Sequence, residues 1–245
     1  MRTEPLGRRL LAEFLGTGLL VTAVIGSGIA AAKLSPGDIG LELLENTAAT
    51  VGALVALILA FGPASGAHFN PVVSLVDRFF GGISTRDTGA YILVQVAGAL
   101  GGSLLANAMF ALPTFEASTM TRSSGPLWLA EVVATFGLVV VIFGVVRSGR
   151  AAAAPFAVGA YIGGAYFFTS STSFANPAVT IGRTITNTFA GIRPSSAPAF
   201  IAAQIVGGAL AVVAIRVLYP HMADSAANVV VPHPPDTPKR LAVRP

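Results

Sequence analysis

The sequence has 245 residues, of which 53% are hydrophobic and 11% charged, with a formal net charge of +4. Soluble domains carry about 25% charged residues, so this composition excludes an ordinary soluble domain and favours a membrane domain. The basic residues are scattered beside apolar runs, as topology determinants are, which argues against nucleic acid as a partner. The sequence contains no cysteine, which excludes disulfides, thiolate metal sites and a cysteine nucleophile.

Six apolar stretches predict transmembrane helices. A helix needs about 20 apolar residues to cross a bilayer core about 30 Å thick. The first stretch follows a basic N-terminus, but it is too long for a signal-peptide core and no small-residue cleavage site follows it. We therefore expect it to be a retained span. The predicted spans are residues 10–32, 47–62, 88–112, 127–146, 151–168 and 198–218.

Two further apolar segments, residues 70–82 and 176–190, are too short to span, and each begins with Asn-Pro. Proline suits the first position of a helix, where its missing N–H is not needed. Each segment therefore predicts a half-helix that starts inside the membrane, which requires surrounding protein or a wet cavity. The tail at residues 221–245 is rich in proline and charge, and we expect it to be disordered at the cytoplasmic surface.

The two halves of the chain repeat in the same order: a Glu-bearing span, an Asn-Pro half-helix and a Gln-bearing span. The matched residues are Glu13 and Glu131, Asn70 and Asn176, and Gln95 and Gln204. Each repeat, at about residues 8–115 and 125–220, contributes three spans, so the two must be inserted in opposite orientations. Inverted repeats place the functional site near the midplane between the halves. We expect one channel domain over residues 1–220.

Basic residues set the expected orientation. With both termini in the cytoplasm, 11 of the 15 basic residues fall on the inner side and four on the outer side. This bias follows the positive-inside rule. The outer residues are Lys33, Arg122, Arg183 and Arg193.

The paired Asn-Pro motifs carry a family resemblance. Asn70-Pro71-Val72 and Asn176-Pro177-Ala178 resemble the Asn-Pro-Ala signatures of the aquaporin, or major intrinsic protein, superfamily. One such motif is a common turn starter, but two, one in each repeat, are specific. The resemblance covers about residues 10–218 and implies an all-α membrane fold of six transmembrane helices plus two half-helices. Val72 departs from the usual alanine, and we expect it to narrow or reshape the junction.

Two opposed half-helices would bring their positive N-termini together at mid-membrane. Asn70 and Asn176 can cap those ends while their amide groups donate into a pore. The positive ends repel cations and protons, which leaves neutral, hydrogen-bonding solutes. Asparagines that act solely as structural caps remain an alternative.

Three further residues are expected to support the loops. Acids inside spans are costly, and the resemblance implies that Glu13 and Glu131 accept hydrogen bonds from loop backbone. His68, just before the first half-helix, is interpreted as a loop-fixing residue. A proton-coupling role for the acids and a pH gate at His68 are the alternatives. No metal-ligand spacing and no nucleophile–base pair is visible, so we expect no enzyme activity, metal or cofactor.

The resemblance places a selectivity filter at four positions counted from the two asparagines: Thr50, Gly164, Ser173 and Val179. Aquaporins usually carry arginine at the last position. Here Arg183 follows one turn later on the same face, and we expect it further out, in the vestibule. The alternative that Arg183 swings inward and restores a charged filter stays open.

A wide, uncharged filter predicts a passive channel for glycerol, urea, water and undissociated metalloid acids such as arsenite, as in bacterial aquaglyceroporins, including those associated with arsenic resistance. A water-selective aquaporin and a proton-coupled secondary transporter are the alternatives. The resemblance implies a homotetramer with one pore per subunit. We expect it in a bacterial plasma (inner) membrane.

Overall fold

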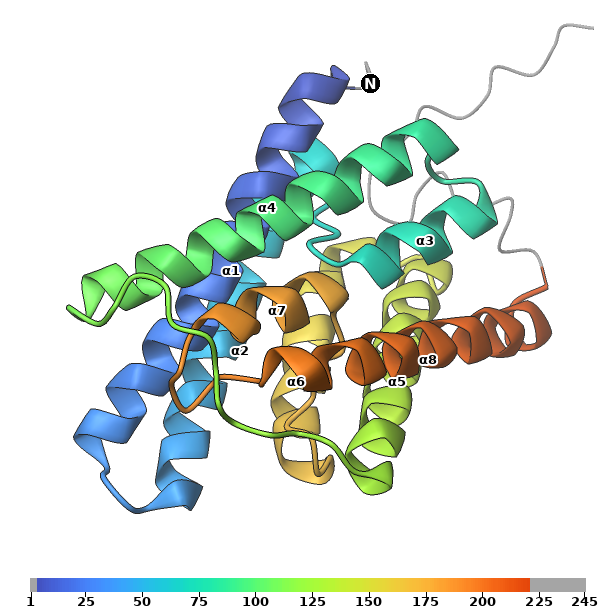
Figure 1. Cartoon of the computed structure of the whole chain (residues 1–245). Coiled ribbons are helices and arrows are strands. Elements are labelled where there is room, and N and C mark those ends of the chain that lie inside the picture. The colour runs from blue at the N-terminus through green and yellow to red at the C-terminus, as the bar shows by residue number, and fades with distance from the viewer. Residues whose placement is uncertain (1–3, 221–245) are drawn as a thin grey trace, which may run out of the picture.

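The computed structural model describes residues 4–220, so the tail expected to be disordered lies outside the described residues. In this part of the chain every regular element is helical (Figure 1). The α-helices are α1 Leu6–Leu34, α2 Ile39–Ser65, α3 Pro71–Phe80, α4 Thr85–Met109, α5 Gly125–Arg147, α6 Ala154–Phe168, α7 Pro177–Gly182 and α8 Ala197–Leu218, and the short 3-10 helices are Ala151–Ala153, Arg183–Ile185 and Pro194–Ser196.

Six of these helices are long and apolar enough to cross a membrane, and they confirm the six predicted spans. The main difference is at α2, which begins eight residues earlier than predicted. The Asp38 side chain accepts a hydrogen bond from the Leu41 N–H and caps the helix, so the polar residues that follow are helical. Charges near a membrane surface end a hydrophobic run without ending a helix.

The second half-helix is shorter than predicted. α7 ends at Gly182, and the following 3-10 turn ends at Ile185 rather than continuing to Ala190. Thr186 is extended and donates to the Asn107 side chain of α4.

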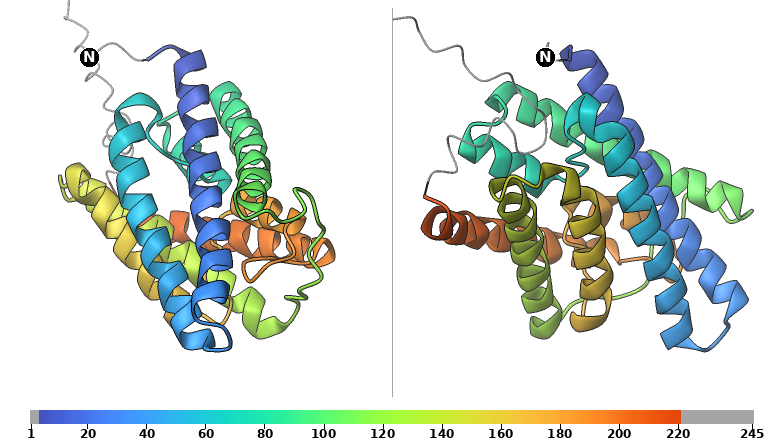
Figure 2. Two further views of the ribbon diagram at one scale, coloured as in Figure 1. Left: turned by 90° about the vertical axis from the view of Figure 1, so that its left-hand side faces the viewer. Right: turned by 180° about the vertical axis from the view of Figure 1, so that it is seen from behind.

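Equivalent helices pack in equivalent ways in the two repeats. α1 packs on α2 and α4, and α5 packs on α6 and α8 (Figure 2). Glycines allow the closest of these contacts, because a Cβ on Gly98 would overlap the Phe14 carbonyl oxygen and one on Gly207 the Val132 carbonyl oxygen. Small residues of this kind permit close helix approach in lipid, where the hydrophobic effect gives little drive.

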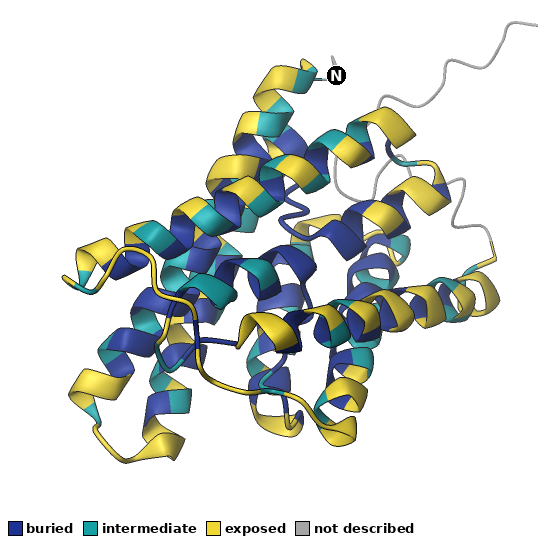
Figure 3. Ribbon diagram, viewed as in Figure 1, coloured by how far each residue is buried: buried dark blue, intermediate teal, exposed yellow. Residues whose placement is uncertain are grey.

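The interior of the molecule is built around the half-helices. The residues from Ser65 to Ser74 are all buried (Figure 3), whereas large apolar side chains on the outer faces of the long helices are exposed. This distribution reverses that of a soluble protein and suits a lipid environment. α7 packs on α4 and α3 packs on α8, so each half-helix contacts the opposite repeat.

Candidate pore between the two half-helices

The half-helices meet end to end through their capping asparagines. Asn70 Oδ1 accepts from the Val72 N–H at 2.9 Å, and Asn176 Oδ1 accepts from the Ala178 N–H at 3.0 Å. Each Nδ2 then donates across the junction at 2.7 Å, Asn70 to the Ala175 carbonyl and Asn176 to the Phe69 carbonyl. From this meeting point α3 and α7 extend in opposite directions (Figure 1). Each amide nitrogen keeps one further hydrogen to donate.

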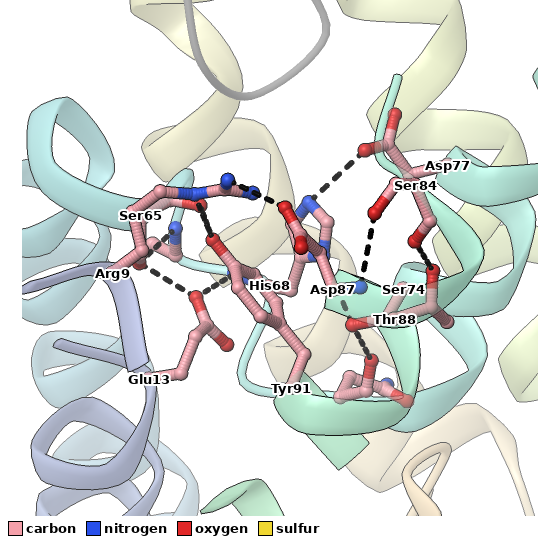
Figure 4. Close-up of polar contacts among 12 residues, drawn as sticks. Arg9, Glu13, Ser65, His68, Ser74, Asp77, Ser84, Asp87, Thr88 and Tyr91 are labelled. Carbon is pink, nitrogen blue, oxygen red and sulfur yellow. Dashed lines mark hydrogen bonds and ion pairs between the residues drawn. The ribbon is translucent and has the colours of Figure 1, made fainter. Parts of the chain in front are cut away.

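A buried glutamate holds the loop that precedes each half-helix. The Glu13 carboxylate accepts from Ser65 Oγ at 2.6 Å, from Gln95 Nε2 at 2.8 Å and from two backbone N–H groups, those of His68 at 2.9 Å and Phe69 at 2.7 Å. Figure 4 shows Glu13 beneath Ser65 and His68. All four partners donate, so both oxygens of Glu13 act as acceptors that hold the loop.

Glu131 repeats this arrangement in the second half. It accepts from Ser171 Oγ at 2.6 Å, from Gln204 Nε2 at 2.6 Å, and from the N–H groups of Phe174 and Ala175 at 2.9 Å. Both glutamates are completely buried. The matching donor sets account for the Glu and Gln that recur in each repeat.

The loops present carbonyl groups once their N–H groups are bound to the glutamates. Residues at equivalent positions have positive φ, Ala67 and Phe69 in one loop and Ser173 and Ala175 in the other. Within the described residues, the carbonyls of Gly66 to His68 and of Thr172 to Phe174 have no hydrogen-bond partner. These loops therefore offer acceptors to a solute beside the amide donors of the asparagines.

A cavity of about 100 Å³ runs past the junction. Its wall combines apolar side chains from four of the long helices, the two loops, both asparagines and a few polar side chains. The lining residues are Leu20, Val24, Thr50, Leu54, Ile58, Gly66, Ala67, His68, Phe69, Asn70, Val73, Leu138, Ile142, Ala154, Val158, Ile162, Tyr166, Ser173, Phe174, Ala175, Asn176, Val179 and Arg183.

Three of the four expected filter residues lie in this wall: Thr50, Ser173 and Val179. The fourth expectation requires correction, because Gly164 is exposed on the outside of α6 and Tyr166 lines the cavity instead. Tyr166 Oη lies 3.3 Å from Thr50 Oγ1, which itself donates to the Asn46 carbonyl at 2.8 Å. The wall is therefore narrower and more aromatic here than a glycine would make it.

Val72 also differs from its expectation. It does not line the cavity, and its side chain packs against α8 at Gly208, where an added Cβ would overlap Val72 Cγ1. Pro71, Pro177 and Ala178 likewise lie in the half-helices outside the cavity wall. The side chain of Val72 is accommodated by a glycine on the neighbouring helix and lies away from the cavity.

His68 lies in the cavity wall with its imidazole held by the first half-helix. Its Nδ1 is 2.9 Å from Ser74 Oγ, and its Nε2 is 3.5 Å from Asp77 Oδ2, a contact that Figure 4 shows directly. Asp77 is buried and does not line the cavity. Its equivalent in the second repeat is Arg183, since each follows its Asn-Pro asparagine by seven positions.

Arg183, which we expected in the vestibule, lies in the wall of this cavity. Its guanidinium carbon is 3.4 Å from the centroid of the Phe174 ring. Arg122, in the loop before α5, lies 5.3 Å from the centroid of the same ring, and burial lowers the pKa of this guanidinium. Neither the position of Arg183 nor that of Tyr166 had a clear signal in the sequence.

The described residues contain no group of three or more His, Asp or Glu side chains placed to hold a metal ion. The residues that line the cavity provide hydrogen-bonding groups, a largely apolar wall and one guanidinium.

A model of the major intrinsic protein family matches residues 1–173. The chain is 50% identical over 218 residues to aquaglyceroporin AqpS of Rhizobium meliloti (strain 1021), which covers 89% of this chain and 93% of that protein. It is 32% identical over 266 residues to a glycerol uptake facilitator protein of Pseudomonas aeruginosa, over 92% of this chain and 93% of the other.

The fold also resembles a solved structure. The X-ray structure of the aquaglyceroporin from Plasmodium falciparum superimposes with a TM-score of 0.64 over 89% of this chain and 99% of that chain. The sequence identity of the two is 21%, so the likeness supports the fold alone.

Proposed function

Because this chain belongs to the major intrinsic protein family of membrane channels, which are not enzymes, we propose that it conducts small uncharged solutes larger than water as well as water itself. The proposed solutes are glycerol, urea and undissociated metalloid acids such as arsenite. The observation that carries the proposal is the cavity in which both asparagines face a continuous, largely apolar wall. The names of two relatives, an aquaglyceroporin and a glycerol uptake facilitator, favour glycerol among these solutes.

The centre of the cavity favours neutral solutes that contain oxygen. The N-termini of α3 and α7 each carry about half a positive charge, which repels cations and protons. Asn70 and Asn176 each retain one amide hydrogen, so a passing oxygen can accept from both. A water whose oxygen is occupied in this way cannot relay a proton to the next water.

The composition of the wall favours solutes with both polar and apolar faces. Val179 leaves the usual position of the filter arginine uncharged, and Thr50 and Ser173 are small and polar. Tyr166 narrows the wall on its side and adds an aromatic face. Glycerol carries hydroxyls on one edge and carbon on the other, which matches such a wall. A strictly water-selective filter would need tighter, more polar surroundings.

Passive conduction is favoured over proton coupling by the hydrogen bonds of the buried acids. Glu13 and Glu131 each accept four hydrogen bonds from donors that also hold the half-helix loops. Protonation would remove an acceptor from each set and loosen the loops. The two glutamates therefore serve the structure of the pore, and a proton carrier would require acids free to change state.

We also propose a homotetramer in the plasma (inner) membrane of a bacterium, with both termini in the cytoplasm. The orientation rests on the distribution of basic residues, 11 inside and four outside. Protease accessibility of a C-terminal tag in oriented vesicles tests the orientation, and native mass spectrometry tests the assembly.

The functional test is a panel of solutes in reconstituted vesicles. Water, glycerol, urea and arsenous acid are compared under one gradient by stopped-flow light scattering, or by elemental analysis for arsenic, against empty vesicles. We expect all four to pass faster than in empty vesicles, without dependence on a proton gradient. Passage of water alone would favour the water-selective alternative, and uptake that follows the proton gradient would favour a transporter.

A further inference from the structure

Arg183 is the single charged side chain among the cavity-lining residues in the described part of the chain, apart from the titratable imidazole of His68. It comes from the turn that follows α7, one helical turn after Val179. An arginine in an otherwise apolar wall is costly unless it is held and partly hydrated. Its placement therefore calls for an account of what holds it and of what it faces.

The guanidinium is held on one edge and one face. Nε donates to the Ala190 carbonyl, and the Phe174 ring lies 3.4 Å from Cζ. The backbone carbonyl of Arg183 accepts from the Ile192 N–H at 3.1 Å, which ties the turn to the same loop. A guanidinium stacked on an aromatic face is a favourable cation–π contact. The side chain is thus fixed in position and does not reach into the cavity as a free arm.

The outer edge of the guanidinium remains available. Between residues 4 and 220, neither Nη atom of Arg183 has a hydrogen-bond partner. Both Nη atoms nevertheless keep some solvent-accessible surface. A fully sealed, unpaired Nη would be a severe cost. Because Arg183 is otherwise buried and lines the cavity, we assign both Nη groups as donors to the cavity.

No carboxylate neutralises this charge among the described residues. Arg183 forms no ion pair there, and the oxygens of Glu131, the acid of the same repeat, are occupied by four other donors. The nearby Arg122, on the same Phe174 ring, adds a second positive charge but does not line the cavity. The wall at this level therefore carries a net positive charge.

We propose that Arg183 is the specificity-determining cation of this pore: it excludes small cations and donates from both Nη groups to the oxygens of neutral solutes. This inference rests on the proposed channel function and takes up the alternative of a filter charged by Arg183. A cation within a few ångströms of a fixed charge in a medium of low dielectric is repelled strongly, whereas a neutral solute gains hydrogen bonds.

Urea and guanidinium form a matched pair of test solutes, because both are small, planar and three-branched and they differ by one charge. Vesicles containing the protein are exposed to each solute with the membrane potential clamped by valinomycin and potassium. We expect the unmodified channel to pass urea and exclude guanidinium. Arg183→Gln should raise the flux of guanidinium by about tenfold or more and change that of urea much less.

Three further variants isolate the charge. Arg183→Lys keeps the charge without the planar fork, so it should still exclude guanidinium. Arg183→Met retains an unbranched apolar stem against Phe174 and is the second neutral variant if the glutamine variant does not assemble. Arg122→Gln, which removes the cation beside the same ring but outside the wall, should raise the flux of guanidinium much less than Arg183→Gln does and leave that of urea unchanged.

The results separate the inference from the function on which it rests. If the unmodified protein passes neither urea nor glycerol, the proposed channel function fails. If neutral variants at position 183 pass urea yet exclude guanidinium as well as the unmodified channel does, the assignment to Arg183 is overturned. Leakage of guanidinium through Arg183→Lys equal to that through Arg183→Gln would also overturn it.

Discussion

Replacing Glu131 by glutamine tests the idea that the buried glutamates hold the half-helix loops. Each oxygen of Glu131 accepts two hydrogen bonds, from Ser171 and Phe174 on one side and from Ala175 and Gln204 on the other. A glutamine presents an amide nitrogen to one of these pairs, so at least one backbone N–H loses its acceptor in either orientation. Each unsatisfied buried donor costs about 1–3 kcal/mol, and the bonds that persist lose their charge-assisted strength. We expect a total loss of about 2–5 kcal/mol.

Thermal unfolding in detergent, followed by the fluorescence of the single tryptophan, Trp128, measures this loss. For a chain of this size it corresponds to a fall in Tm of about 5–15 °C. Flux should fall as well, because the Ala175 carbonyl accepts from Asn70 across the junction. Glu116→Gln is the control, since this exposed acid accepts one hydrogen bond from Asn187. A Glu131→Gln protein that unfolds within about 1 °C of the unmodified one, with unchanged flux, would refute this account.

Two further substitutions probe the wall and the helix packing. Val179→Arg adds a second guanidinium one turn from Arg183, and in the vesicle assay it should slow glycerol more than water; equal slowing of both would contradict the assignment of the filter. Gly98→Ala should cost about 1–3 kcal/mol of stability, because its methyl group would overlap the Phe14 carbonyl oxygen, whereas Gly101→Ala, with open space around it, should be nearly neutral. Thermal unfolding of the two glycine variants side by side tests this difference, and equal stability would argue against close packing of α1 and α4.

The parts of the fold that the sequence predicts well depend on local chemistry. Asn is a favoured N-cap and Pro suits the first helical position, so both half-helix starts, at Pro71 and Pro177, follow from the sequence. Runs of apolar residues likewise predict the six spans, because lipid allows little else over that length. The start of α2 escaped prediction because hydropathy detects the membrane core and not the end of the helix.

The wall of the cavity is harder to predict, because it depends on how the chain leaves its helices. Counting back from Asn176 gives Gly164 only if the connection to α6 has a fixed length and path. In the structure the chain turns extended at Thr169 and passes through a left-handed Thr172, and Tyr166 faces the cavity. The inward position of Arg183 likewise depends on a ring and a carbonyl that lie elsewhere in the sequence.

The inverted repeat makes the two entrances of the cavity alike in backbone and unlike in charge. Seven positions after the asparagine, one half-helix carries Asp77, behind His68, and the other leads into Arg183, in the wall itself. At equilibrium an uncharged molecule crosses the channel at the same rate in both directions. An ion that arrives from bulk water, however, meets a guanidinium in the wall on one side of the junction only, so inhibition by charged compounds should be sided although permeation is not.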